Sequence, residues 1–188
     1  MRPFRVEAPE NPVLVVWDGG NGLATHCGLE SDDLRKALVE DFERAAVDYL
    51  DGYAGRLGRC ILRQKWALPL QCAAATETVF LPFPDCRKFA VEQLDAEDVW
   101  SAVAGVTVTQ MDDHALLEDL PTDQTGLYLT CYAGWETVAE VPENLKQVVR
   151  MLVAYWFDNR DAATPNRSAQ ALPLVVETLI APLVSVFV

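Results

Sequence analysis

One segment constrains the fold more than any other: residues 141–160, VPENLKQVVRMLVAYWFDNR, which have the pattern of a long amphipathic helix. Pro142 and Glu143 suit its start, because a missing N–H costs nothing in the first turn and a carboxylate is stabilised there. Apolar residues then recur at steps of three and four: Leu145, Val148, Val149, Leu152, Val153 and Trp156. Since Tyr155 and Phe157 make its second half apolar nearly all round, we expect this helix at the centre of the core.

Two further segments predict helices that pack beside it. Residues 31–55 begin with Ser31 as N-cap and place charged residues, Glu43 among them, on the solvent face. Their apolar stripe is Leu34, Leu38, Phe42, Ala45, Tyr49 and Tyr53, widened by Val39, Ala46 and Leu50. Residues 172–182 open with Leu172-Pro173 and are expected to bury Leu174, Val175, Leu179 and Ile180.

Between the first two helices the apolar period changes from helical to two, which is typical of strands. Four strand candidates follow one another, at residues 62–70, 79–84, 103–110 and 126–133. The sequence therefore predicts a single domain, 1–188, that is mainly α with an inserted β subdomain (α+β). Its helical bundle would have three main helices, at 31–55, 141–160 and 172–182, and a small antiparallel β-rich insertion at 59–135.

Several classes of protein are disfavoured by composition. No apolar run reaches the roughly 18 residues of a membrane span, and the N-terminus lacks the apolar core of a secretory signal, so we expect a cytosolic protein without a membrane partner. Five widely spaced cysteines without a Cys-x-x-Cys pair favour buried thiols over disulfides or a zinc site. The glycines of Asp18–Gly22 indicate a turn, because no Gly-Lys-Ser/Thr follows them.

The net charge of −13 is unevenly distributed. Residues 89–145 contain no lysine or arginine, yet they hold twelve acids: Glu92, Asp95, Glu97, Asp98, Asp112, Asp113, Glu118, Asp119, Asp123, Glu136, Glu140 and Glu143. Such a surface repels phosphate backbones, which disfavours an ordinary nucleic-acid-binding protein. A solvated acidic face is the simplest interpretation.

An enzyme is the competing class. Asp112, Asp113 and His114 offer two carboxylates and an imidazole that suit a divalent metal, as in a small metal-dependent hydrolase. Adjacent loop residues seldom converge on one ion, and neither a second ligand cluster nor a Gly-x-Ser-x-Gly elbow is present. We therefore expect no catalytic residues, no metal and no cofactor.

The last six residues, 183–188, are apolar and uncharged, which is unusual because chain ends are normally solvated. They suit either a strand that docks on its own domain or one that adds to the sheet edge of a partner. The second alternative makes four residues candidates for contact with a neighbouring chain: Val184, Val186, Phe187 and Val188.

The order and wording of six segments resemble a known family. They are Tyr53-Ala54-Gly55-Arg56, a strand with Trp66, YLTCYAGW at 128–135, VPENLKQ at 141–147, AYWFDNR at 154–160 and ALP at 171–173. Over residues 31–182 the chain thereby resembles the head-tail connector (adaptor) proteins of long-tailed phages, prophages and phage-derived gene transfer agents. Residues 1–30 do not share the resemblance.

The resemblance implies a structural protein of the virion or phage-like particle. It would form a ring of about twelve copies beneath the portal protein, extend the DNA channel and carry the next neck protein, a stopper. It would be made in the bacterial cytoplasm and end in the particle's neck. The alternative within this class is another neck protein, a stopper or a tail completion protein.

Such a ring should let DNA pass without specific binding, and a carboxylate lining would avoid the counterion release by which basic surfaces hold duplexes. Part of the acidic span is therefore expected to face the channel, with these candidates: Glu92, Asp95, Glu97, Asp98, Asp112, Asp113, Glu118 and Asp119.

Overall fold

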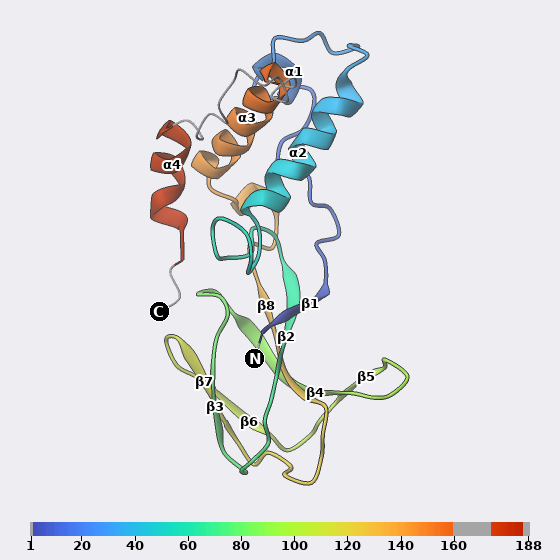
Figure 1. Cartoon of the computed structure of the whole chain (residues 1–188), viewed down its shortest axis with the longest axis vertical. Helices are drawn as coiled ribbons and strands as arrows, with labels where there is room; N and C mark the ends of the chain where they lie inside the picture. Colours follow the sequence, from blue (N-terminus) through green and yellow to red (C-terminus); the bar gives the residue numbers. More distant parts are fainter. Residues whose placement is uncertain (1, 160–173, 186–188) are drawn as a thin grey trace, which may run out of the picture. The chain divides into compact units, whose positions relative to one another are not determined.

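The computed structural model describes residues 2–159 and 174–185 (Figure 1). Contacts within the chain divide it into two compact units. We call residues 2–9 and 62–135 the sheet unit, and residues 10–61, 136–159 and 174–185 the helical unit.

The mainly α prediction is wrong. Of the described chain, 28% is helical and 25% is strand, with four α-helices and two antiparallel sheets of eight strands in all, so the fold is a sheet-rich α+β fold. The insertion holds more strands than the sequence indicated, because several are only three to five residues long and pair with segments distant in the chain.

The helical unit is built around α3 (Glu143–Asp158), which lies where the sequence placed its central helix. This helix packs against α1 (Leu23–His26), α2 (Lys36–Leu50) and α4 (Leu174–Ile180), and Figure 1 shows α3 between the latter two. Short 3-10 helices, Val138–Glu140 and Ala181–Leu183, precede α3 and follow α4. Five apolar side chains of α3 are fully buried: Leu145, Val148, Val149, Leu152 and Val153. Burial of this stripe removes apolar surface from water and stabilises the unit.

Helix α2 begins later and faces another way than its stripe predicts. It starts at Lys36, and Ser31 is not its N-cap. The buried face consists of Val39, Glu43, Ala46, Val47 and Leu50. Val39, Ala46 and Leu50, which were expected to widen the stripe, are buried, whereas the predicted centre of the stripe lies on a neighbouring flank, where Tyr49 is 40% exposed. Leu34 precedes the helix and is 100% exposed. Both flanks are apolar at helical spacing, so periodicity alone could not choose between them.

Helix α4 shows a smaller shift of the same kind. Val176 and Ile180 are buried, whereas Val175, which was expected inside, is 55% exposed. Residues 172 and 173 lie outside the described part of the chain.

The sheet unit contains two antiparallel sheets. The five-stranded sheet has the order β1-β2-β8-β4-β5, formed by Phe4–Glu7, Gln64–Pro69, Leu127–Ala133, Arg87–Leu94 and Trp100–Ala102. The three-stranded sheet has the order β3-β7-β6, formed by Glu77–Phe80, His114–Glu118 and Thr107–Gln110. The four strand candidates correspond to β2, β3, β6 and β8, with β3 ending before Pro82.

One face of the five-stranded sheet carries the unit's core. Leu129 and Cys131 of β8 are fully buried, and Trp66 of β2 meets Phe83 edge to face with ring centres 5.0 Å apart. The Sγ atoms of Cys131 and Cys86 lie 3.2 Å apart. Four of the five cysteines are buried free thiols, and Cys27 is half-buried.

Across residues 2–159 and 174–185, no helix has the length and apolar character needed to cross a lipid bilayer.

Candidate interaction surfaces

The chain's C-terminal segment is described only as far as Ser185. The Ser185 N–H donates to the Leu57 carbonyl over 2.8 Å, and the Val184 N–H donates to the Ile180 carbonyl over 3.1 Å. Val184 is 36% exposed, so this candidate contact residue is accessible. The other three candidates, Val186, Phe187 and Val188, lie outside the described residues.

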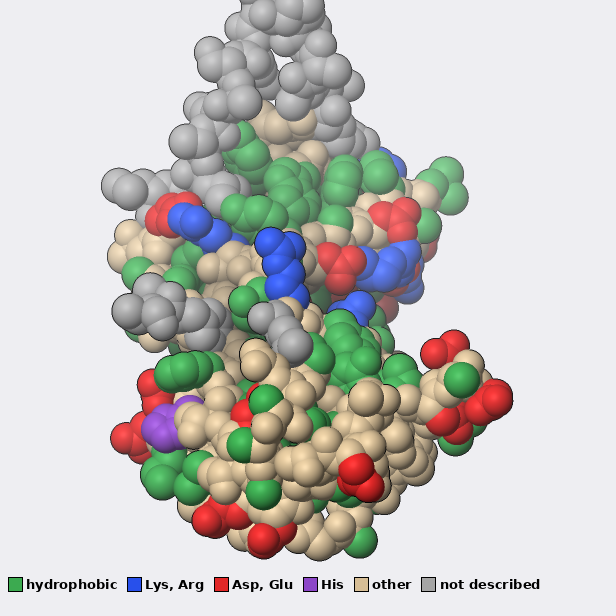
Figure 2. Space-filling view, turned by 60° about the horizontal axis from the view of Figure 1, so that its bottom comes forward, with side chains coloured by type: hydrophobic (Ala, Val, Ile, Leu, Met, Phe, Trp, Pro, Cys, Tyr) green, Lys and Arg blue, Asp and Glu red, His purple; other side chains and the backbone are tan. Residues whose placement is uncertain are grey.

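The candidate channel acids fall into three exposed groups in the sheet unit. They are the β4–β5 turn (Asp95, Glu97, Asp98), the β6–β7 turn (Asp112, Asp113) and the end of β7 (Glu118, Asp119). Glu92, the eighth candidate, is half-buried and lies 2.8 Å from Lys65 Nζ. On the face that Figure 2 draws, acidic side chains form separate groups rather than one patch.

The β4–β5 turn is held by one of its own acids. Asp95 Oδ1 accepts the backbone N–H groups of Glu97, at 2.9 Å, and Val99, at 2.8 Å. Asp98 has a φ of 59°, a left-handed conformation that aspartate tolerates better than most residues. Asp95 is therefore a structural residue of the turn, while Glu97 and Asp98 are exposed to solvent.

The turn that suggested a metal site makes a simpler local contact. His114 Nδ1 and Asp113 Oδ1 are 2.7 Å apart, and this hydrogen bond holds the pKa of Asp113 below its usual value. Both residues and Asp112 line an open surface hollow beside Pro84. Among the described residues, no three His, Cys, Asp or Glu side chains are grouped as metal ligands would be. The arrangement therefore gives the hydrolase alternative no support.

A basic cluster that the sequence analysis missed lies at one end of the five-stranded sheet. Strand pairing aligns Lys65 with Tyr132 and Tyr132 with Arg87. The Tyr132 ring centre is 4.4 Å from Arg63 Cζ and 5.9 Å from Lys88 Nζ. We call Arg63, Lys65, Arg87 and Lys88 the basic end; they are all the lysines and arginines of residues 62–135. The sequence does contain two short pairs of basic residues, Arg63 with Lys65 and Arg87 with Lys88, each at or near the start of a strand. Only the pairing of β2, β8 and β4 brings the two pairs together.

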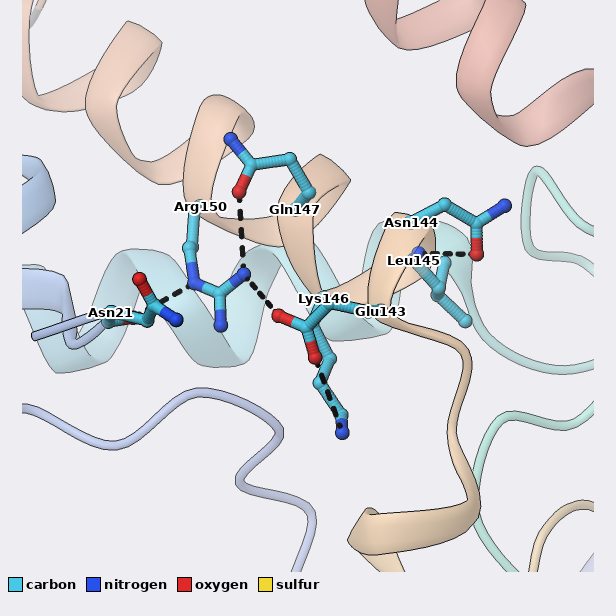
Figure 3. Close-up of polar contacts among 7 residues, drawn as sticks. All are labelled: Asn21, Glu143, Asn144, Leu145, Lys146, Gln147 and Arg150. Atoms are coloured by element: carbon cyan, nitrogen blue, oxygen red, sulfur yellow. Dashed lines mark hydrogen bonds and ion pairs between the residues drawn. The ribbon is translucent and has the colours of Figure 1, made fainter.

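The Asp18–Gly22 turn of the helical unit is anchored by a buried arginine on α3 (Figure 3). Arg150 Nε donates to the Asn21 carbonyl over 2.8 Å, and Nη1 donates to Glu143 Oε1 over 2.7 Å and to Gln147 Oε1 over 3.3 Å. These contacts lower the pKa of Glu143, chiefly through the hydrogen bond from Arg150. The turn is thus a packing element of the helical unit, and no phosphate-loop motif is required to explain its glycines.

The sequence matches no protein-family model and no curated protein. Comparison of the fold with solved structures gives matches over the whole chain. One is a chain in the "Neck of empty GTA particle computed with C6 symmetry", with a TM-score of 0.69 and 23% identity. Others are chains in the "Virion of native gene transfer agent (GTA) particle", with 0.64 and 20%, and in the "Neck of native GTA particle computed with C12 symmetry", with 0.63 and 21%.

Each match covers 100% of this chain and 97% of the other. Agreement over such complete lengths includes both the sheet unit and the helical unit. The protein therefore shares its fold with chains found in gene transfer agent particles, two of them described as necks.

Proposed function

We propose that this protein is a structural neck protein of a phage or phage-like particle, and within the neck a head-tail connector (adaptor). The observation that carries the proposal is the full-length likeness to chains of gene transfer agent particles. Those neck assemblies have C6 or C12 symmetry, which is consistent with a ring. The resemblance of residues 31–182 to connector proteins favours the adaptor over a stopper or tail completion protein.

In this role, about twelve copies assemble on the portal protein and provide a platform for the stopper. The protein works by contact and has no reaction to catalyse. It is made in the bacterial cytoplasm and ends in the neck of the particle.

The decisive experiment mixes the purified protein with rings of its portal protein and examines the mixture by electron microscopy. An added ring directly on the portal is the result expected of an adaptor. A protein that joins the portal only after another neck protein has bound is a stopper or tail completion protein. A protein that never joins portal complexes has another function.

Part of the acidic surface is proposed to line the channel, because carboxylates repel the phosphates of a passing duplex. Replacing Asp112 and Asp113 with lysine in the assembled ring should then raise its affinity for duplex DNA at low salt. Lysine at Glu40 and Asp48 of α2 introduces the same charge in the helical unit and is the control. Equal DNA binding by both variants would show that the β6–β7 turn does not face the channel.

The C-terminal segment, residues 183–188, is proposed to pair with a strand of the portal. Its six residues are all uncharged and five are apolar, which suits addition to a sheet edge. A chain ending at Pro182 should fold normally and lose affinity for portal rings in a pull-down. Unchanged portal binding by the shortened chain would contradict this docking mode.

A further inference from the structure

We propose that Cys86 and Cys131 form an oxidation site, at which hydrogen peroxide joins the two thiols as an intramolecular disulfide of the sheet unit. The site follows from the geometry of that unit alone. Its role in a particle rests on the proposed function.

The two sulfur atoms already lie within reach of each other. Cys131 Sγ donates a hydrogen bond to Cys86 Sγ over 3.2 Å, and both residues are free thiols. A disulfide bond is about 2.04 Å long, so the sulfur atoms have to approach by only about 1 Å. Small rotations about the two Cα–Cβ bonds supply a movement of this size.

The fold holds the two backbone positions together. Cys131 lies in β8, which is paired on both sides, with β2 and with β4. Cys86 directly precedes β4, whose first residue, Arg87, pairs with Tyr132, the neighbour of Cys131. The Cys86 carbonyl also accepts the Nε2 group of Gln110 over 3.3 Å. The thiols therefore have a high effective concentration without further ordering of the chain.

The oxidation consumes one peroxide molecule. The Cys86 thiolate attacks one oxygen, the O–O bond breaks, and the departing hydroxide takes up the proton that Cys86 released, which leaves a sulfenic acid and water. Cys131 sulfur then attacks Cys86 sulfur, the S–O bond breaks, and hydroxide leaves as a second water with the proton of Cys131. The two thiols are oxidised to a disulfide, and the peroxide is reduced to two waters.

The surroundings make this reaction slow. The hydrogen bond with Cys131 and the burial of Cys86 raise the pKa of Cys86 above its ordinary value. Because the thiolate is the reactive form, only a small fraction of Cys86 can react at any moment. The pair thus stays reduced in the cytoplasm, where thiols are kept reduced, and becomes oxidised in a particle that has left the cell. The disulfide joins residues 45 positions apart and ties the start of β4 to β8.

Peroxide treatment of the folded protein tests the site. Purified wild type is exposed to a tenfold molar excess of hydrogen peroxide for several hours, alkylated, digested and analysed by mass spectrometry. We expect a linked peptide pair that contains Cys86 and Cys131, at least tenfold more abundant than a link between any other two cysteines. Cys27→Ser, which removes a half-buried thiol outside the pair, is the matched control and should give the same link in the same yield. Cys86→Ala and Cys131→Ala should give none.

Thermal melting measures what the link does. The oxidised wild type should melt about 5–15 °C higher than the reduced protein, and dithiothreitol should reverse the gain. Thiols that stay free, links through other cysteines, or a link that forms only after unfolding in urea would overturn the site, because folded geometry would then not direct the bond. This result needs the wild type alone, so it stands even where an alanine variant fails to fold. An unchanged melting temperature of the linked protein would overturn the stabilising effect.

The outcomes separate this inference from the proposed function. Particles purified without reductant should carry the link, whereas protein alkylated in the lysate before release should not, and free thiols in released particles would overturn the role in the particle. Wild-type protein that adds no ring to portals overturns the adaptor proposal and leaves the oxidation site intact. Wild-type protein that adds rings but never forms the link overturns the oxidation site alone.

Discussion

At the residue scale, Glu43 shows how a charged side chain can serve a helix's buried face. It is 2% exposed, and its Oε1 accepts the N–H groups of Leu14, at 2.8 Å, and Val15, at 3.3 Å. Burial raises the pKa of Glu43, and the two N–H donors oppose that shift only in part. The residue therefore fixes the segment before the Asp18–Gly22 turn to α2, at the cost of a carboxylate removed from water.

This environment predicts a pH dependence of stability. Because the folded pKa of Glu43 lies above the unfolded value of about 4.5, the folded state holds the proton more tightly, and stability falls as the pH rises from about 4.5 through the folded pKa. Glu43→Gln keeps an oxygen acceptor and removes this titration, so its stability relative to the wild type should rise over that interval. Urea denaturation from pH 4 to pH 8 measures the difference.

Glu43→Ala is the companion variant. It leaves two buried N–H groups without their acceptor and should lower the free energy of unfolding by about 1–3 kcal/mol at all these pH values. A Glu43→Gln variant as unstable as Glu43→Ala would contradict the acceptor role.

Gly134 is a second residue whose identity is dictated by its surroundings. Its φ is 95°, and a Cβ there would collide with the carbonyl group of Leu62. Gly105 has a similar φ of 88°, but nothing lies within 4 Å of a Cβ placed there. A substitution at Gly105 therefore measures backbone strain without a steric clash. Gly105→Ala should cost about 1–2 kcal/mol and Gly134→Ala about 3–5 kcal/mol in urea denaturation, because the second adds overpacking to strain. Equal losses would argue against the close approach of Leu62.

At the element scale, α2 offers a direct test of which flank is buried. Leu50 is fully buried and Leu38, on the flank that the sequence favoured, is half-exposed. Leu50→Ala should lower the free energy of unfolding by about 2–5 kcal/mol, whereas Leu38→Ala should cost about 1 kcal/mol or less. Because both variants make the same leucine-to-alanine change, each serves as the control for the other. The reverse order would restore the flank predicted from the sequence.

The contrast between α2 and α3 explains how much of the helical unit the sequence could predict. The stripe of α3 could be identified because Leu145, Leu152 and the other apolar residues of the stripe recur at helical spacing along one face. Helix α2 carries apolar residues on two adjacent flanks and buries a glutamate, so the choice depends on the tertiary hydrogen bonds to Leu14 and Val15. Such contacts join residues about 29 positions apart and leave no local pattern.

The missed strands have a related explanation. Strand β4 begins at Arg87, but its second residue, Lys88, has a φ of 54° and the register shifts between Arg87 and Ala90. The two-residue alternation is therefore broken where the strand starts. Strand β1 has four residues and is stabilised by pairing with β2, about 60 residues later in the chain. Underestimating such strands produced the mainly α prediction.

At the scale of the whole molecule, charge is arranged by the fold rather than by the sequence alone. The span without lysine or arginine was visible from residue 89 onward. What the sequence could not show is that Arg63 and Lys88, 25 positions apart, flank one tyrosine. The basic end depends on antiparallel pairing of β2, β8 and β4, and this is why the candidate site predicted from the sequence contained only acids and the tail.

The topology of the insertion also predicts that the helical unit folds without the sheet unit. Leu62 bridges to Trp135, and the Arg63 N–H donates to the Trp135 carbonyl over 2.9 Å, so the insertion leaves and returns to the helical unit at adjacent points. A shortened chain can therefore be made with a short Gly-Ser linker in place of residues 62–135. Residues 1–9 are removed as well, because their partner strand β2 lies in the replaced segment. The linker should close without strain. The helices that pack against α3, namely α1, α2 and α4, all belong to the helical unit and are retained.

The shortened chain should give a helical circular dichroism spectrum and a cooperative thermal transition. Leu152→Ala within it is the control. It should lower the melting temperature by about 10 °C or more if α3 is packed as in the full chain, since a leucine-to-alanine cavity costs about 2–5 kcal/mol. A shortened chain that melts without cooperativity, or that is indifferent to Leu152→Ala, would mean that the helical unit draws its stability from the sheet unit. If it folds but adds no ring to portals, assembly requires surfaces of the sheet unit.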